Sequence, residues 1–184
     1  MEPDDPAAEI QAKILAGRLL TLGARHSSEA LDQFSSWLLG GFGAAFALLI
    51  VNVENVSKHL AIRSLRSAVW LFLAMLLLGV VSKLLAAILR AAGGAAAESE
   101  SMGHDLADRE VEINFKTVFR ETEEATFPSM RRLVAASLRR VEHGDFAAGG
   151  RLYARLAQVQ GFIVFVEVAL AVAAALVLAC GLAV

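Results

Sequence analysis

Two ionisable residues, Lys83 and Glu167, lie inside apolar runs of this sequence. Glu167 belongs to the run from residue 161 to 184, and Lys83 belongs to the run from residue 67 to 89. A carboxylate inside a bilayer costs at least about 2.5 kcal/mol, so it is expected to have a partner or to be protonated. Each residue lies seven positions from the loop-side end of its helix, which is roughly 10 Å into the membrane at about 1.5 Å per residue. The sequence therefore predicts an intramembrane polar pair of Lys83 and Glu167.

Three interpretations of this polar pair stay open. The two side chains could form a structural salt bridge. Alternatively, Lys83 extends its aliphatic stem to the membrane interface and Glu167 is hydrogen-bonded to another neighbour. In the third interpretation the pair handles protons or ions, because ionisable residues inside membranes often mark such sites.

Small residues on the apolar runs predict where the helices pack, since they allow close approach of helices in membranes. On the second run, Gly79 shares a face with Lys83. On the first run, the expected helix-packing residues are Ser36, Gly40, Gly43, Ala44 and Ala47.

Evidence for enzyme or metal chemistry is weak. His104, Asp108 and Glu112 have a spacing that can present metal ligands on one helix face, but no second histidine stands nearby. Acidic residues on a solvated helix are the ordinary case, and no hydrolase, metalloprotease, dinucleotide-binding or phosphate-binding loop motif occurs. We expect no metal, no cofactor and no enzyme activity.

The composition indicates a membrane protein. Of the 184 residues, 57% are hydrophobic and only 20% are charged, whereas soluble domains are about 45 to 50% apolar. The net charge of −2 and the lack of a basic stripe argue against nucleic-acid binding. The lone cysteine, Cys180, lies in the last apolar run, so no disulfide framework is expected.

The hydrophobic pattern predicts an all-α integral membrane protein with three transmembrane helices, because each apolar run is long enough to cross a core of about 30 Å. The expected segments are an amphipathic N-terminal helix at 1–32, a transmembrane hairpin at 33–90 with spans at 33–53 and 67–89, a cytoplasmic helical hairpin at 91–159, and a third span at 160–184.

Sequence signals also predict the ends of the polar helices. Asp5 is the expected N-cap of the N-terminal helix, with Pro6 at its first position. This helix would lie on the membrane surface or on the cytoplasmic helices. The run GGAAA at 93–97 predicts a hinge, and Pro128 predicts the start of a helix. Residues 98–124 carry nine acids and three bases, and residues 129–159 carry six bases and two acids, so the hairpin would bring opposite charges together.

Basic residues indicate the orientation in the membrane. Segment 91–159 holds nine Lys and Arg residues and the N-terminal flank holds three, whereas the turn between the first two spans holds three. The larger number favours a cytoplasmic N-terminus. Heavy use of alanine and arginine is associated with GC-rich bacterial genomes, and hence with the inner membrane.

These features predict an interaction, assembly or scaffold component of a bacterial inner membrane, with the lipid bilayer and a membrane or cytoplasmic protein as partners. The alternative is a homo-oligomeric channel, a pore-forming effector or a transporter subunit that uses Lys83 and Glu167. The layout of a two-span hairpin with cytoplasmic helices resembles the two-span effector domains of bacterial defence systems, and that resemblance implies membrane permeabilisation on a signal.

Overall fold

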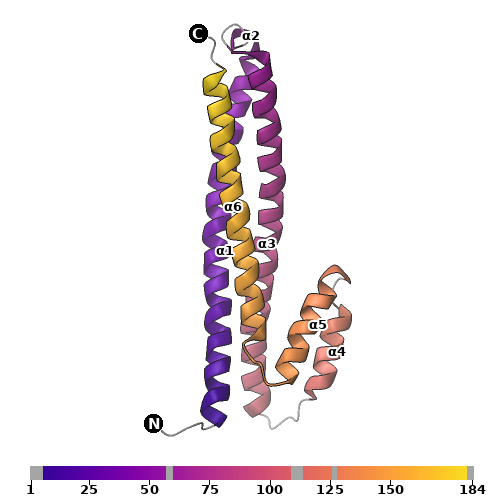
Figure 1. Cartoon of the computed structure of the whole chain (residues 1–184). Coiled ribbons are helices and arrows are strands. Elements are labelled where there is room, and N and C mark those ends of the chain that lie inside the picture. The colour runs from indigo at the N-terminus through magenta and orange to yellow at the C-terminus, as the bar shows by residue number, and fades with distance from the viewer. Residues whose placement is uncertain (1–5, 57–59, 109–113, 126–127, 182–184) are drawn as a thin grey trace. The chain divides into compact units, whose positions relative to one another are not determined.

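The computed structural model of the chain describes residues 6–56, 60–108, 114–125 and 128–181 (Figure 1). These residues form six α-helices: α1 Pro6–Val51, α2 Val53–Val56, α3 Ile62–Asp108, α4 Phe115–Ala125, α5 Pro128–Glu142 and α6 Ala148–Cys180.

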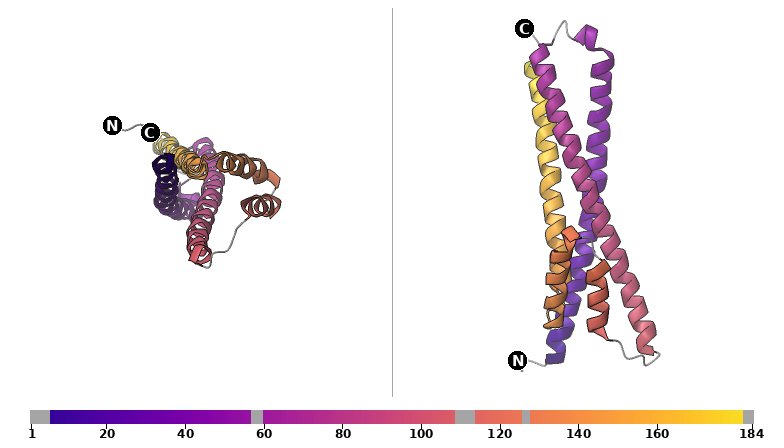
Figure 2. Two further views of the ribbon diagram at one scale, coloured as in Figure 1. Left: turned by 90° about the horizontal axis from the view of Figure 1, so that it is seen from below. Right: turned by 90° about the vertical axis from the view of Figure 1, so that its right-hand side faces the viewer.

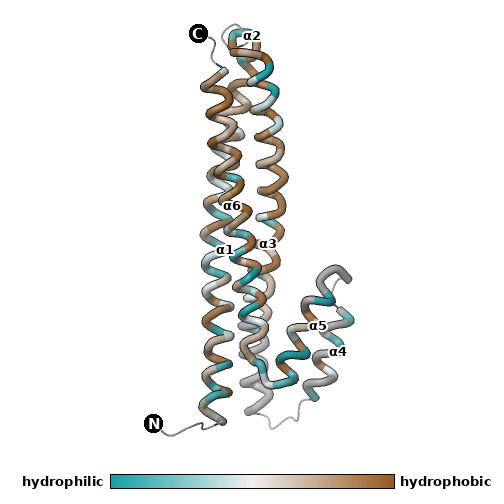
Figure 3. The backbone as a smooth tube through the Cα atoms, in the orientation of Figure 1, coloured by the Kyte–Doolittle hydropathy of each residue, from teal (hydrophilic) through white to brown (hydrophobic). Residues whose placement is uncertain are grey.

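Three of the helices are long and apolar enough to cross a membrane. The qualifying stretches are Ala8–Val51 of α1, Ile62–Ala95 of α3 and Ala148–Cys180 of α6. Figure 3 shows the apolar residues gathered along these helices. The prediction of a helical protein with three membrane-spanning candidates is therefore confirmed.

The long helices differ from the prediction in their continuity. The predicted N-terminal helix and the first span are one helix, α1, which begins at Pro6; the predicted cap, Asp5, lies outside the described residues. The hinge predicted at residues 93–97 is wrong, because α3 continues through it. Alanines flank both glycines, and the side chain of Arg25 covers Gly93, with its Cδ 3.1 Å from the place that a Cβ would take.

The chain divides into two compact units. The apolar unit consists of Ser27–Ile88 and Ala157–Val184, and the polar unit consists of Met1–His26 and Leu89–Leu156. Segments of α1, α3 and α6 contribute to both units, and α4 and α5 belong to the polar unit. Figure 2 shows the three segments of the apolar unit side by side from two further directions.

Buried residues on α3 and α6 recur at steps of three, four or seven, with Ala148 at the start of α6 as the one exception among the described residues. On α3 they are Ala68, Met75, Gly79, Ser82, Ala86, Leu89 and Gly93. On α6, after Ala148, they are Gly150, Ala157, Gln160, Val164, Glu167, Ala171, Ala174 and Gly181, the last just after the helix end. This seven-residue repeat is the pattern of coiled coils. Most of these side chains are small, as expected where membrane helices approach closely.

In the polar unit, α4 and α5 contact each other (Figure 1). Asn114 caps α4, since its Oδ1 accepts a hydrogen bond of 3.3 Å from the Thr117 N–H, and Pro128 begins α5 as predicted. Among the described residues of the predicted acidic segment, those up to Asp108 belong to α3, and the contact with α5 is made by α4.

The connection from α5 to α6 is a defined turn. Gly144 has a φ of 82°, a conformation that glycine adopts without strain. Its N–H donates to the Val141 carbonyl at 2.9 Å, and the Asp145 N–H donates to the Arg140 carbonyl at 2.9 Å. This is the Schellman motif, and it satisfies the last carbonyls of α5. Helix α5 therefore ends at Glu142 with its last carbonyls paired.

Candidate functional site

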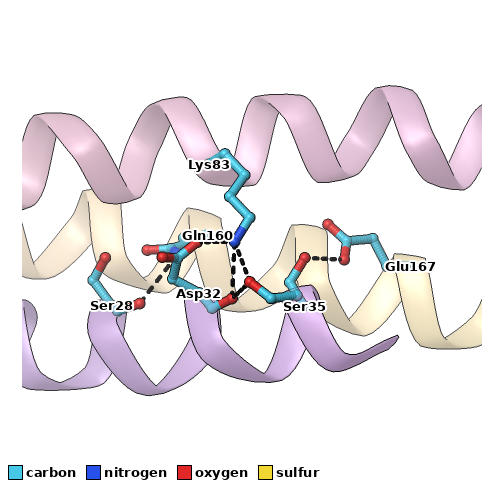
Figure 4. A network of polar contacts seen from close by, with 7 residues as sticks. Ser28, Asp32, Ser35, Lys83, Gln160 and Glu167 are labelled. Atoms are coloured by element: carbon cyan, nitrogen blue, oxygen red, sulfur yellow. Dashed lines mark hydrogen bonds and ion pairs between the residues drawn. The ribbon is translucent and has the colours of Figure 1, made fainter. Parts of the chain in front are cut away.

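The candidate site is a network of polar side chains in the apolar unit (Figure 4). Helix α1 contributes four residues of this polar network, α6 contributes two and α3 contributes one. They are Ser28, Asp32, Ser35, Ser36, Gln160, Glu167 and Lys83.

Lys83 reaches from α3 to α1. Its Nζ lies 2.7 Å from Oδ1 of Asp32 and 3.2 Å from the main-chain oxygen of Asp32, and it also donates to the Ser36 hydroxyl. The ammonium group therefore makes two hydrogen bonds and one ion pair with this part of α1. The Ser36 hydroxyl in turn donates to the Asp32 main-chain oxygen at 2.7 Å. Lys83 is thus paired in charge with Asp32 and donates two hydrogen bonds to the same turn of α1.

Glu167 faces a different residue of α1. The Ser35 hydroxyl donates to Oε2 of Glu167 at 2.7 Å, and both residues are fully buried. Burying a carboxylate without a counter-charge is costly in hydrocarbon. A hydrogen bond from a hydroxyl offsets part of this cost.

Gln160, seven residues before Glu167 on α6, also contacts a serine of α1. Its Nε2 donates to the main-chain oxygen of Ser28 at 3.4 Å, and both residues are fully buried. Ser28 and Ser35 are also seven residues apart on α1. The repeat therefore places two polar contacts between α1 and α6, two helical turns apart.

Several buried oxygens of this region have no hydrogen-bond partner among the described residues. They are Oγ of Ser28, Oγ of Ser82, Oε1 of Gln160 and Oε1 of Glu167. Unsatisfied buried polar atoms cost about 1 to 3 kcal/mol each. The network therefore combines an ion-paired cluster around Lys83 with buried polar atoms on all three helices whose hydrogen bonding is incomplete.

The predicted partners Lys83 and Glu167 belong to one network but have different contacts. Among the described residues, the ion pair of Lys83 is with Asp32, and the hydrogen bond of Glu167 is with Ser35. Asp32 directly precedes the uncharged run that begins at residue 33, so the predicted first span, 33–53, does not include it. The aliphatic stem of Lys83 brings the ammonium group to Asp32.

The structure places the predicted helix-packing residues on different faces. Gly79 is buried, and the place that its Cβ would take lies 2.5 Å from Cδ1 of Leu39. On α1 the buried residues of the apolar unit are Ser28, Ser35 and Phe46. Gly43 is half-buried, and Ser36, Gly40, Ala44 and Ala47 are exposed. Packing through this exposed face stays a prediction that concerns a partner outside the chain.

Beyond the polar network, apolar side chains fill the apolar unit. Phe46 and Met75 are 3% and 1% exposed. The ring of Phe46 stacks on that of Phe72, with centroids 4.4 Å apart and planes at 10°. Among the described residues of α6, nothing polar lines this part of the core from Val168 onward, since residues 168–180 are all apolar apart from Cys180, which is exposed.

The predicted metal-ligand spacing falls where side chains are not described. His104 and Asp108 lie on α3, but their side chains are outside the description, and Glu112 lies outside the described residues altogether. The rest of the described chain holds no group of three candidate ligands.

Sequence reasoning missed Ser28, Asp32 and Ser35 of α1 as members of the network. A signal for them was present, because polar residues recur at seven-residue spacing in otherwise apolar seams, as Ser28 with Ser35 and Gln160 with Glu167.

Comparison with protein-family models, with curated proteins and with solved structures finds no match for this chain.

Proposed function

We propose that this chain is a membrane-anchored interaction or assembly component of a bacterial inner membrane, without transport or enzyme activity of its own. The observation that carries the proposal is the way the polar network ends. Its residues on α1 and α6 lie within Ser28–Ser36 and Gln160–Glu167. The stacked Phe46 and Phe72 with the buried Met75 fill the core beyond this stretch. Transport needs polar groups along a path, and a single copy offers a closed apolar core.

The lengths of the helices support a role in presenting protein surface. A helix needs about 20 residues to cross a bilayer, whereas α1 has 46 and α3 has 47. More than half of the residues in each of these two helices are therefore not needed to cross the hydrocarbon core and can present a surface to other proteins. Exposed charged residues on α5, such as Arg131, Arg132 and Arg139, give the polar unit a surface suited to a soluble or peripheral protein.

Site-specific photo-crosslinking in the native membrane tests this function. A benzoylphenylalanine in place of exposed Arg132 on α5 is expected to form a protein adduct of defined mass. The same probe in place of exposed Trp37 on α1 serves as the matched control and is expected to give no such adduct. Liposomes that contain the purified chain are expected to hold ion gradients as well as empty liposomes do. Ion flux through the liposomes, with no adduct at Arg132, would rule out the scaffold function.

A homo-oligomeric pore is the second candidate function, and the exposed small residues of α1 favour it. Nothing lies within 4 Å of the place that a Cβ would take at Gly40, Gly41 or Gly43. A second copy of the chain could approach this face closely, as small residues allow in membranes. In that case Trp37 variants would form adducts between copies, and the liposomes would leak.

We further propose that the N-terminus and residues 93–159 are cytoplasmic. A membrane-impermeant maleimide applied to intact cells checks this orientation in a Cys180→Ser background. We expect labelling of Asn52→Cys, in the turn after α1, and labelling of Glu98→Cys on α3 only after permeabilisation; both positions are exposed. The reverse pattern would show that the orientation is inverted.

A further inference from the structure

The polar unit contains a cavity of about 120 Å³ between α5 and the first turns of α6. Three arginines line it, namely Arg140 from α5 and Arg151 and Arg155 from α6. The other lining residues are Ala136, Ser137, Ala148 and Leu152. A water molecule occupies about 30 Å³ of liquid, so this cavity accepts a group several times larger than one water.

The charge of this cavity is not balanced by the residues described around it. Arg151 forms an ion pair with Asp145. The guanidinium groups of Arg140 and Arg155 have no hydrogen bond or ion pair with any other residue that the structure describes. Two uncompensated guanidinium groups at one cavity repel each other, and an anion between them would remove that repulsion.

Helix geometry directs these side chains to one place. Arg151 and Arg155 are four residues apart on α6, so they share a face, and Ser137 and Arg140 are three apart on α5. The turn at Gly144 reverses the chain between the two helices. The Ser137 hydroxyl then lies 4.0 Å from the place that a Cβ of Gly149 would take, which confirms the close approach of the two helices here.

We propose that this arginine cavity binds a phosphate group. Arginine donates paired N–H groups in a planar fork that matches phosphate oxygens. The first turn of α6, where Ala148 lines the cavity, adds the positive end of a helix dipole. The ligand chemistry is that of a phosphate ester carrying net negative charge, from an anionic lipid headgroup or from a soluble phosphate compound.

Position along α6 favours the headgroup as the source. Arg155 precedes the apolar run that begins at Gly161 by six residues, which is roughly 9 Å along a helix. Headgroup phosphates lie within such a distance of the hydrocarbon. Basic pockets beside membrane helices bind anionic headgroups in this way.

Thermal unfolding of the purified full chain in a neutral detergent tests the proposal. The added probes are short-chain phosphatidylglycerol, short-chain phosphatidylcholine with the same acyl chains, and inorganic phosphate. We expect phosphatidylglycerol to raise Tm, because a ligand that binds only the folded state stabilises it. The variant Arg140→Gln/Arg155→Gln is expected to bind about 30-fold more weakly, since each arginine near an anionic surface contributes roughly a five-fold factor. The matched control is Arg132→Gln/Arg139→Gln, which removes the same charge from exposed positions outside the cavity.

Each outcome is informative. A rise in Tm that the cavity variant loses and the control keeps supports the proposal, and an equal response to inorganic phosphate would assign the source to a soluble compound. Equal responses to phosphatidylglycerol and phosphatidylcholine, equal losses in the two double variants, or no response to any probe would overturn it. Arg140→Lys/Arg155→Lys preserves the charge if the glutamine variant fails to fold. It is expected to bind more weakly than the wild type, because lysine lacks the paired donors of arginine.

Discussion

Replacing Lys83, whose side chain is 42% exposed, with methionine is expected to lower the free energy of unfolding by about 1 to 3 kcal/mol, because the substitution leaves a partly buried carboxylate without its counter-charge. The residue left behind is Asp32, whose side chain is 16% exposed. Adding Asp32→Asn should restore much of the loss, since the double variant contains neither charge. Unfolding in mixed detergent micelles gives the free energies, and the double-mutant cycle gives the coupling between the two residues.

A second cycle with Glu167 serves as the control. Lys83→Met and Glu167→Gln are expected to be additive within about 0.5 kcal/mol, because the hydrogen bond of Glu167 comes from Ser35. A coupling of Lys83 with Glu167 that exceeds its coupling with Asp32 would contradict the arrangement of the network, and it would favour the direct pair that the sequence predicts.

Gly150→Ala is expected to destabilise the chain by about 1 to 3 kcal/mol, as overpacking commonly does. A Cβ at Gly150 would lie 2.9 Å from Cα of Gly17 and even closer to the Gly17 carbonyl oxygen. Main-chain atoms cannot rotate aside as a flexible side chain can. The penalty therefore outweighs the gain of about 1 kcal/mol in helix propensity that alanine brings.

The adjacent glycine provides a matched comparison for Gly150. A Cβ at Gly149 would meet only the Ser137 Oγ, at 4.0 Å, so Gly149→Ala should stabilise the chain by roughly 0.5 to 1 kcal/mol. Thermal unfolding of both variants in the same detergent measures the difference. If both substitutions shift Tm in the same direction, the close approach of α1 and α6 at Gly17 is not a constraint on folding.

The sequence predicted the elements of the fold better than their connections. Long uncharged runs identify membrane helices because the bilayer sets a minimum length. A proline at a first helical position and a glycine after a last one mark ends, as Pro128 and Gly144 do. The pair Gly93–Gly94 misled the prediction because helix propensity is a weak local preference, which the packing of Arg25 on Gly93 can override.

The sequence analysis names Lys83, Glu167 and Ser36, which are all members of the polar network. Lys83 and Glu167 could be named because an ionisable residue in an apolar run is expected to have a polar partner. The residue of α1 that each of them contacts depends on the rotation of α1 about its own axis. Ser35 and Ser36 are adjacent in sequence but point in different directions. Ser35 faces Glu167 of α6, whereas Ser36 faces Lys83 of α3. Periodicity alone does not determine that rotation, because it depends on how three helices share one core.

The seven-residue spacing of the polar contacts between α1 and α6 has a consequence for axial register. Sliding α6 by one repeat along α1 would place Glu167 beside Ser28, so a displaced alignment would keep a polar contact. Features at the two ends of α6 oppose this slip. Gly150 fits only where Gly17 offers bare backbone, and the Gly181 carbonyl accepts the Ala61 N–H at 3.0 Å. The axial position of α6 is thus specified mainly by the main-chain contacts of Gly150 and Gly181 near its two ends. The polar contacts of Gln160 and Glu167, which lie between these glycines, stabilise that position.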